Sequence, residues 1–184
     1  MKRLFLPIVL VCSFGCSSDD SPTAADIADD QILVAGREYI NWAWGYNHRA
    51  KYVDVHGNAY GIAYALNDSI WTLDSSGYYS KEDIDLLIRD AQKQPVNVPK
   101  DDVDLMCLLI PIADKGAYSD TTFTGADMGS TITFAFHYES VSDSYKKIIL
   151  RVEGDFSYHN TSESAKQIDD LISRWLIWGG GLTE

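Results

Sequence analysis

The chain has 184 residues, of which 15 are Lys or Arg and 27 are Asp or Glu, so its formal net charge at pH 7 is −12. A surface this acidic repels phosphate backbones, which argues against nucleic acid as a partner. The length suits one domain with a substantial core and is short for two. We therefore expect a single acidic domain with no nucleic-acid function.

The first 15 residues have the plan of a secretory signal peptide. Lys2 and Arg3 give a positive start, and residues 4–11 are an apolar run too short to span a bilayer as a permanent helix. A small residue followed by Cys16 at the cut site resembles the lipobox of bacterial lipoproteins, although Ser13 stands where that family usually has Leu. The alternative is an ordinary secreted protein that is cut elsewhere.

The lipobox resemblance implies that Cys16 becomes the lipidated first residue of the mature protein and anchors it to a membrane. Residues 16–31 are polar and acidic after the cysteine, which predicts a flexible tether. In this family, Ser17 rather than Asp after the cysteine implies the outer membrane. Residues 32–184 are then the folded domain of a protein of the bacterial cell envelope.

Aromatic residues dominate the start of this domain. Alternation over residues 40–46 predicts a strand, and residues 51–55 and 59–65 predict a hairpin around Gly57-Asn58. Ten Tyr or Trp residues lie between positions 39 and 79. Such residues usually pack a sheet onto its core, but they could also form a platform for a sugar ring or a peptide. The candidate ligand-binding residues of this kind are Trp42, Trp44, Tyr46 and Trp71.

Three helices are expected after this region. Ser80, with Asp83 three residues later, predicts a helix start, and Pro95 closes the segment. Residues 101–110 predict a buried helix, with a strand over 105–112 as the competing interpretation.

The last helix is expected to be capped by Thr161 or Ser162 and to end at the triple glycine 179–181. It has a continuous apolar stripe at helical spacing, made by Ala165, Ile168, Leu171, Ile172, Trp175 and Leu176.

Two strands are predicted over residues 132–139 and 147–152, joined as an antiparallel hairpin, with loops over 115–129 and 154–160. Their polar face would bring together His137, Glu139, Lys147 and Arg151. A His–carboxylate pair could act as a general base with its orienting acid, so His137 and Glu139 are the candidate catalytic residues. Cross-strand pairing of solvated charges explains the same pattern without catalysis.

Other chemistry lacks its usual signature. The four histidines are scattered singly, no cysteine pair is present, and neither Gly-x-Ser-x-Gly nor a phosphate-binding glycine loop occurs. Cys107 lies in an apolar run and is interpreted as a core residue. We therefore expect no metal and no cofactor.

Several short segments resemble a pattern of uncharacterised bacterial lipoproteins. They are Ala43-Trp44-Gly45-Tyr46, Val53-Asp54 followed by Gly57-Asn58-Ala59-Tyr60, Asp127-Met128-Gly129-Ser130, and Gly154-Asp155 with Asn160, Ser162 and Trp175-Leu176. The resemblance implies a single envelope domain and brings no activity with it.

The predicted fold is one α+β domain, an antiparallel sheet of about five strands with about three helices packed on it. The predicted function is that of a non-catalytic lipoprotein that binds an envelope protein or a cell-wall ligand, as an inhibitor or immunity-type partner would. The alternative is a small hydrolase acting on peptidoglycan or peptide, with Asp127 and Asp155 supporting His137 and Glu139.

Overall fold

The computed structural model describes residues 31–43, 45–64 and 78–177. The predicted leader, Cys16, the tether, Trp44, Trp71 and the triple glycine lie outside the described residues. The elements in chain order are β1 (Leu33–Asn41), β2 (Asn47–Asp54), β3 (Asn58–Tyr64), β4 (Tyr78–Ser80), α1 (Lys81–Asp90), β5 (Gln92–Asn97), α2 (Lys100–Ala113), β6 (Thr122–Phe123), β7 (Ser130–Glu139), β8 (Ser144–Gly154), β9 (Phe156–His159) and α3 (Glu163–Trp175).

The described strands form one antiparallel sheet in the order β5-β3-β2-β1-β7-β8-β9-β6, with β4 paired to β8. The described chain confirms the predicted α+β class with three helices. The sheet of the described residues has nine strands, so the expectation of about five strands was wrong. Most of the missed strands are too short for a period-two pattern: β4, β6 and β9 have 3, 2 and 4 residues. The β5 segment is polar and contains Pro95, which suits a strand at the border of a sheet.

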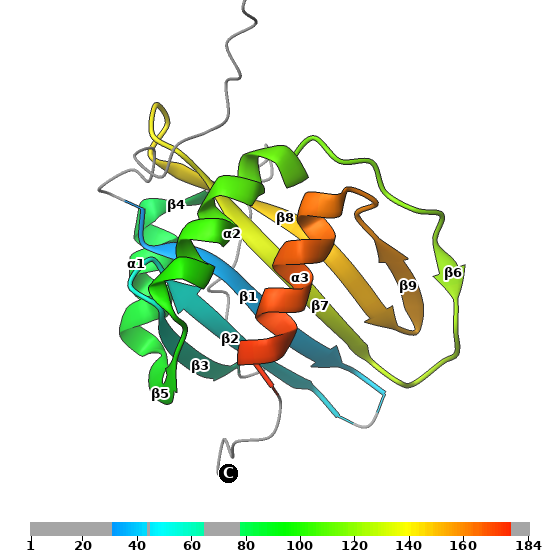
Figure 1. Ribbon diagram of the computed structural model, residues 1–184. Helices are drawn as coiled ribbons and strands as arrows, with labels where there is room; N and C mark the ends of the chain where they lie inside the picture. The colour runs from blue at the N-terminus through cyan, green and yellow to red at the C-terminus, as the bar shows by residue number, and fades with distance from the viewer. Residues whose placement is uncertain (1–30, 44, 65–77, 178–184) are drawn as a thin grey trace, which may run out of the picture.

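Helices cover both faces of the sheet (Figure 1). Helices α2 and α3 lie side by side on one face, and α1 lies on the other. The core under α2 and α3 is mainly aliphatic and includes Val34, Met106, Leu150 and Ile168. The core on the α1 face is aromatic and includes Tyr52, Tyr64, Tyr79, Phe134, Phe136 and Tyr145. Six described aromatic residues are thus fully part of this core, as the simpler interpretation of the sequence proposed, whereas others, such as Trp42, are exposed.

The predicted helix starts are confirmed. The Ser80 hydroxyl accepts a hydrogen bond from the Asp83 amide at 3.2 Å, and the Asp83 carboxylate accepts one from the Ser80 amide at 3.1 Å. Ser162, rather than Thr161, caps α3. Helix α2 continues through Pro111 to Ala113, so the alternative strand over 105–112 was wrong.

The predicted β2–β3 hairpin is confirmed, because one carboxylate oxygen of Asp54 accepts from the amides of His56 and Asn58 at 2.9 and 2.8 Å. The predicted strand over 40–46 was wrong, since β1 ends at Asn41 and β2 begins at Asn47. The Asn41 side chain accepts from the Ala43 amide at 2.8 Å, and Gly45 has a φ of 103°, so the chain turns between the two strands.

The β7–β8 hairpin is confirmed, but its register differs from the expected one. His137 lies opposite Lys146, and a bulge shifts the pairing between Thr133 and Phe134. As a result Lys147 points to the α1 face, while Arg151 reaches α3 on the other face. The predicted shared face of His137, Glu139, Lys147 and Arg151 was therefore wrong for Lys147. The predicted loop over 154–160 was also wrong in part, because it contains β9.

Gly36 tests how tightly β1 packs at the centre of the sheet. A methyl group there would lie 2.6 Å from the Phe134 ring and 2.7 Å from the Lys51 carbonyl oxygen. We expect Gly36→Ala to lower the free energy of unfolding by about 2 kcal/mol or more, measured by urea denaturation. The control is Gly125→Ala, whose nearest contact is the flexible end of Met128, so its midpoint should hardly change. Equal midpoints for the two variants would contradict this packing.

Candidate binding surface and the polar networks of the sheet

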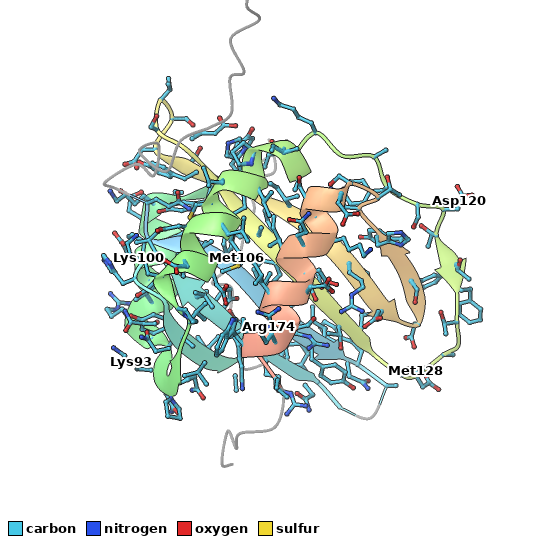
Figure 2. The ribbon with its side chains drawn as sticks, viewed as in Figure 1. Lys93, Lys100, Met106, Asp120, Met128 and Arg174 are labelled. Carbon is cyan, nitrogen blue, oxygen red and sulfur yellow. The ribbon has the colours of Figure 1, made fainter. Side chains whose placement is uncertain are left out.

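Four large apolar side chains are exposed along one border of the molecule. Trp42, Phe123, Met128 and Phe156 have 67%, 64%, 54% and 52% of their surface exposed, and we call them the edge patch. Figure 2 shows Met128 at this border, with Asp120 further along it beside β6. Exposed apolar side chains that gather in this way are typical of a contact surface rather than of a solvated one.

Contacts around Asp155 join the members of the edge patch. The rings of Phe123 and Phe156 are 5.5 Å apart between centroids. The Met128 amide donates to the Asp155 carboxylate at 2.8 Å, and the Thr124 amide donates to the Asp155 carbonyl oxygen at 3.0 Å. These bonds hold β9 and the loop before β7 together, so the patch rests on ordered backbone.

A recess of about 450 Å³ lies between Trp42 and this loop. Asp127 and Asp155 belong to its lining, together with Ile40 and Ile132 of the sheet. Gly129 allows the close approach that shapes it, because its φ is 71° and a methyl group there would lie 2.7 Å from the Ile40 carbonyl oxygen. The recess therefore has an aromatic side, an apolar floor and carboxylates.

Most of this border is formed by segments of the chain that lack positive charge. The sequence contains no Lys or Arg from residue 116 to 145 or from 152 to 165. The same segments contribute Asp120, Asp127 and Asp155, and two of these line the recess. A surface that combines exposed aromatics with carboxylates is complementary to a basic, apolar partner.

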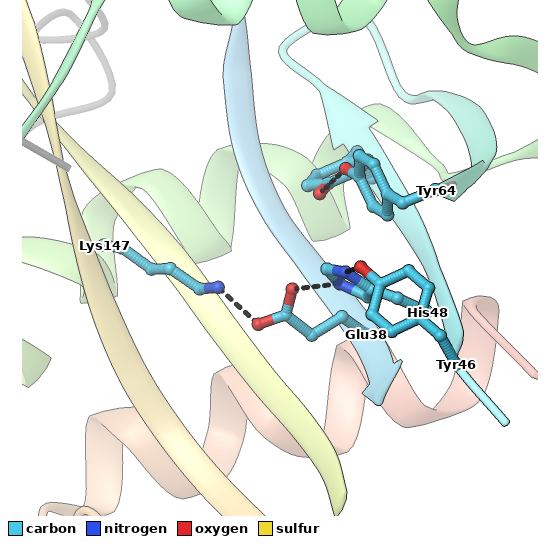
Figure 3. A network of polar contacts seen from close by, with 6 residues as sticks. Glu38, Tyr46, His48, Tyr64 and Lys147 are labelled. Carbon is cyan, nitrogen blue, oxygen red and sulfur yellow. Dashed lines mark hydrogen bonds and ion pairs between the residues drawn. The ribbon is translucent and has the colours of Figure 1, made fainter. Parts of the chain in front are cut away.

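A buried polar network lies beside the floor of the recess, on the α1 face (Figure 3). Glu38 of β1 is 6% exposed, and its two carboxylate oxygens bind Lys147 of β8 and the Nε2 atom of His48 of β2, the latter at 3.2 Å. Ile40 and Ile132, which line the recess, are the cross-strand partners of His48 and Glu38. The network thus fixes the strands that form the recess floor.

Tyrosines complete the network. Because a carboxylate only accepts, the Nε2 atom of His48 donates to Glu38, and its Nδ1 atom is hydrogen-bonded to the Tyr46 hydroxyl at 3.1 Å. The Tyr46 ring also lies against Trp42, with 4.7 Å between centroids. Tyr64 stacks near His48 at 4.3 Å, and its hydroxyl pairs with that of Tyr52 at 2.8 Å. Trp42 and Tyr46, two of the four predicted ligand-binding residues, are therefore in contact.

The environment holds Glu38 in its ionised form. Burial by itself would raise the pKa of Glu38, but the charge of Lys147 and the hydrogen bonds from His48 and Lys147 lower that pKa from 4.5 to about 2. The Lys147 ammonium is also 4.1 Å from the centroid of the Phe134 ring, a cation–π contact that further offsets its burial.

A second histidine–carboxylate pair lies on the other face of the sheet. His137 donates from Nδ1 to Asp114 at the end of α2, at 3.0 Å, and Lys146 binds the other Asp114 oxygen at 2.6 Å. Burial opposes ionisation of Asp114, but the bonds from Lys146 and His137 outweigh it and lower its pKa. Glu139 instead accepts from the Tyr78 hydroxyl at 2.8 Å. The structure thus gives each predicted catalytic residue a different partner.

A groove of about 710 Å³ lies at this end of the sheet, but His137 is not among the described residues that line it. Its lining includes Tyr78, Asp83, Glu139 and Asp143. The His137–Asp114 pair and the groove are therefore separate features. No group of three metal-ligating side chains occurs within the described part of the chain.

Sequence reasoning missed Glu38, His48 and Lys147 as a unit. Glu38 lies in a strand that was not predicted, and His48 was interpreted as an isolated histidine. Lys147 was assigned to the opposite face because the bulge in the hairpin was not foreseen. The only available signal was a pair of adjacent charged residues, Arg37 and Glu38, within a largely apolar strand, which does not identify a partner 109 positions away.

Comparisons with known proteins identify no relative: no family model matches the sequence, and no curated protein or solved structure is significantly similar to it. Over residues 31–43, 45–64 and 78–177, no helix is long and apolar enough to cross a membrane.

Stability at low pH tests the Glu38 network. Because the pKa of Glu38 is lowered on folding, its carboxylate stabilises the fold above pH 4.5, and this contribution is lost as the pH falls toward 2. We expect Glu38→Gln to lower the free energy of unfolding near neutral pH by roughly 3 kcal/mol, since Lys147 is left buried without its partner. The variant should also lose part of the acid sensitivity, and denaturation at neutral and acidic pH measures both effects.

The control for this variant is Glu153→Gln, which removes a half-exposed carboxylate from Arg151. We expect a change within about 1 kcal/mol, because exposed ion pairs contribute little. Equal losses for the two variants would contradict the importance of burial at Glu38.

Proposed function

We propose that this protein is a lipid-anchored binding module of the bacterial cell envelope, and that the edge patch is its contact surface. The observation that carries the proposal is the grouping of exposed Trp42, Phe123, Met128 and Phe156 around carboxylates, the last three of them in segments without Lys or Arg. Exposed aromatics in such a group are typical anchors of protein interfaces. A partner with a basic and apolar surface fits best, as expected for an inhibitor or immunity-type role.

The anchor is proposed from the leader alone. A signal peptide over residues 1–15, lipidation at Cys16 and a tether over 16–31 would place the domain at a membrane, and Ser17 favours the outer membrane. A tether of this length allows the domain to reach a partner beside the membrane without fixing its orientation. A cell-wall ligand bound in the recess at Trp42 is compatible with the same placement.

Internal pairing of the titratable groups favours binding over catalysis. Both oxygens of Glu38 and both oxygens of Asp114 bind a lysine and a histidine of the chain itself. Such carboxylates stabilise the fold and are not open to a substrate. The edge patch, in contrast, is stabilised by backbone bonds and exposes its side chains, which is the arrangement that a contact surface requires.

One observation favours the alternative, a small hydrolase acting on peptidoglycan or peptide. The bond from His137 Nδ1 to Asp114 fixes the ring as an orienting acid does for a general base. Nε2 of His137 has no hydrogen-bond partner among the described residues, so it could accept a proton. If this alternative holds, the full chain should release soluble fragments from peptidoglycan and His137→Gln should not. Equal release by both proteins would exclude His137 as the base.

Capture from an envelope extract tests the binding function. We expect the tagged full chain to retain a basic partner in near-equal amount, and Trp42→Ala to weaken its affinity for that partner at least about tenfold by removing a central aromatic contact. The melting temperature should hardly change, because Trp42 is exposed. Val141→Ala is the matched control, since Val141 is fully exposed in the β7–β8 turn.

An empty capture, or a partner held equally well by Trp42→Ala, would contradict the edge patch as the contact surface. After an empty capture, glycan binding would be tested next, followed by hydrolase assays.

A further inference from the structure

A row of positive charge crosses the sheet on the α3 face, in contrast to the acidic edge patch. In adjacent strands, Lys51 of β2 lies opposite Arg37 of β1, Arg37 lies opposite Thr133 of β7, and Thr133 lies opposite Arg151 of β8. Arg49 is two residues from Lys51 along β2 and projects to the same face. We call Arg37, Arg49, Lys51 and Arg151 the basic row. Figure 1 shows α3 crossing the sheet here, with β9 uncovered beside it.

Three members of the basic row have contacts within the chain. Arg151 binds Asp169 of α3 at 2.9 Å, Glu153 at 2.6 Å and the Ser173 hydroxyl at 3.3 Å. Lys51 donates to the Ile177 carbonyl oxygen at 2.8 Å. The guanidinium carbon of Arg49 is 5.4 Å from the centroid of the Tyr39 ring.

Arg37 is different. Its half-buried guanidinium makes no hydrogen bond or ion pair with any residue that the structure describes, and its Nε atom is buried without a partner. Burial and the charge of Arg151 both lower the pKa of Arg37. Asp169 and Glu153 oppose this effect, but both are bound to Arg151. A cation held among cations is unfavourable unless something else supplies negative charge.

We propose that Arg37 is the centre of a binding site for a phosphate-type dianion, flanked by the other members of the basic row. The planar fork of a guanidinium binds two oxygens of such a group at once. The four cations of the basic row share this face of the sheet, and the two carboxylates beside Arg37, Asp169 and Glu153, are bound to Arg151, so the row suits a dianion better than a single carboxylate. The ligand class is a small molecule or headgroup that carries a phosphate monoester.

The centre of this site lies away from the recess of the edge patch, and the inference goes beyond the proposed function. The recess at Trp42 is lined by Ile40 and Ile132, on the α1 face, whereas Arg37 and Arg151 face α3. The two proposals can therefore be tested separately. Arg37→Gln should lose phosphate binding and keep the partner, whereas Trp42→Ala should lose the partner and keep phosphate binding.

The experiment is a titration of the purified full chain with inorganic phosphate. Calorimetry measures the affinity, and the melting temperature is recorded with phosphate and with chloride at equal ionic strength. We expect phosphate, and not chloride, to raise the melting temperature. Arg37→Gln should weaken the affinity for phosphate about tenfold or more, because a charge-assisted fork is lost. Arg89→Gln, which removes an exposed arginine of α1, should leave that affinity unchanged.

A structural role for Arg37 gives a different result. If Arg37 serves the anion, Arg37→Gln in phosphate-free buffer should melt no lower than the parent protein, because it relieves repulsion. If that variant does not fold, Arg37→Lys keeps the charge without the fork and should still weaken phosphate binding severalfold. No phosphate-specific rise in the parent, or unchanged affinity in the Arg37 variants, would overturn the site.

Discussion

The ion pair between Glu38 and Lys147 is the constraint on which the centre of this sheet depends. It joins β1 to β8 across β7, and the bond to His48 extends the connection to β2. A buried carboxylate without partners would cost several kcal/mol. The strands that carry Glu38, His48 and Lys147 must therefore take the register that brings these groups together, and a slip of one residue would turn all three to the wrong face.

Two consecutive lysines each bind a carboxylate, one on each face of the sheet. Lys146 binds Asp114 beside His137 under the end of α2, and Lys147 binds Glu38 beside His48 among the tyrosines of the α1 face. Side chains alternate along a strand, so adjacent lysines necessarily serve different layers. Each layer thus combines an apolar core with one satisfied carboxylate. The aromatic residues on the α1 face add cation–π and ring contacts that an aliphatic core lacks.

The proposed contact surfaces lie where these layers end. The edge patch belongs to the turn after β1 and to the loops around β6 and β9, which the rigid sheet holds in place. The basic row lies on the sheet itself, beside α3. The acidic chain thus separates its charges in space, with carboxylates at one border and cations gathered on one face. Such separation lets one small domain present two chemically distinct surfaces.

Local patterns in the sequence determined much of the secondary structure. The helix caps and the β2–β3 turn depend on interactions within a few residues of the chain, so the sequence alone predicts them. The residues are Ser80 with Asp83, Ser162 with its apolar stripe, and Gly57. The α+β class follows from these elements together.

Only the tertiary structure decided the sheet order, the bulge after Thr133 and the polar networks. Glu38 and Lys147 are 109 positions apart, and the basic row draws on three strands. No local pattern in the sequence therefore predicts the ion pair or the row. The strand β6 has only two residues, too few for a pattern along the chain, so its pairing with β9 defines it. The sequence by itself thus determined where the helices begin and which segments are apolar. Long-range pairing decided which charged residues meet, because burial of a charge depends on partners that only the folded chain brings close.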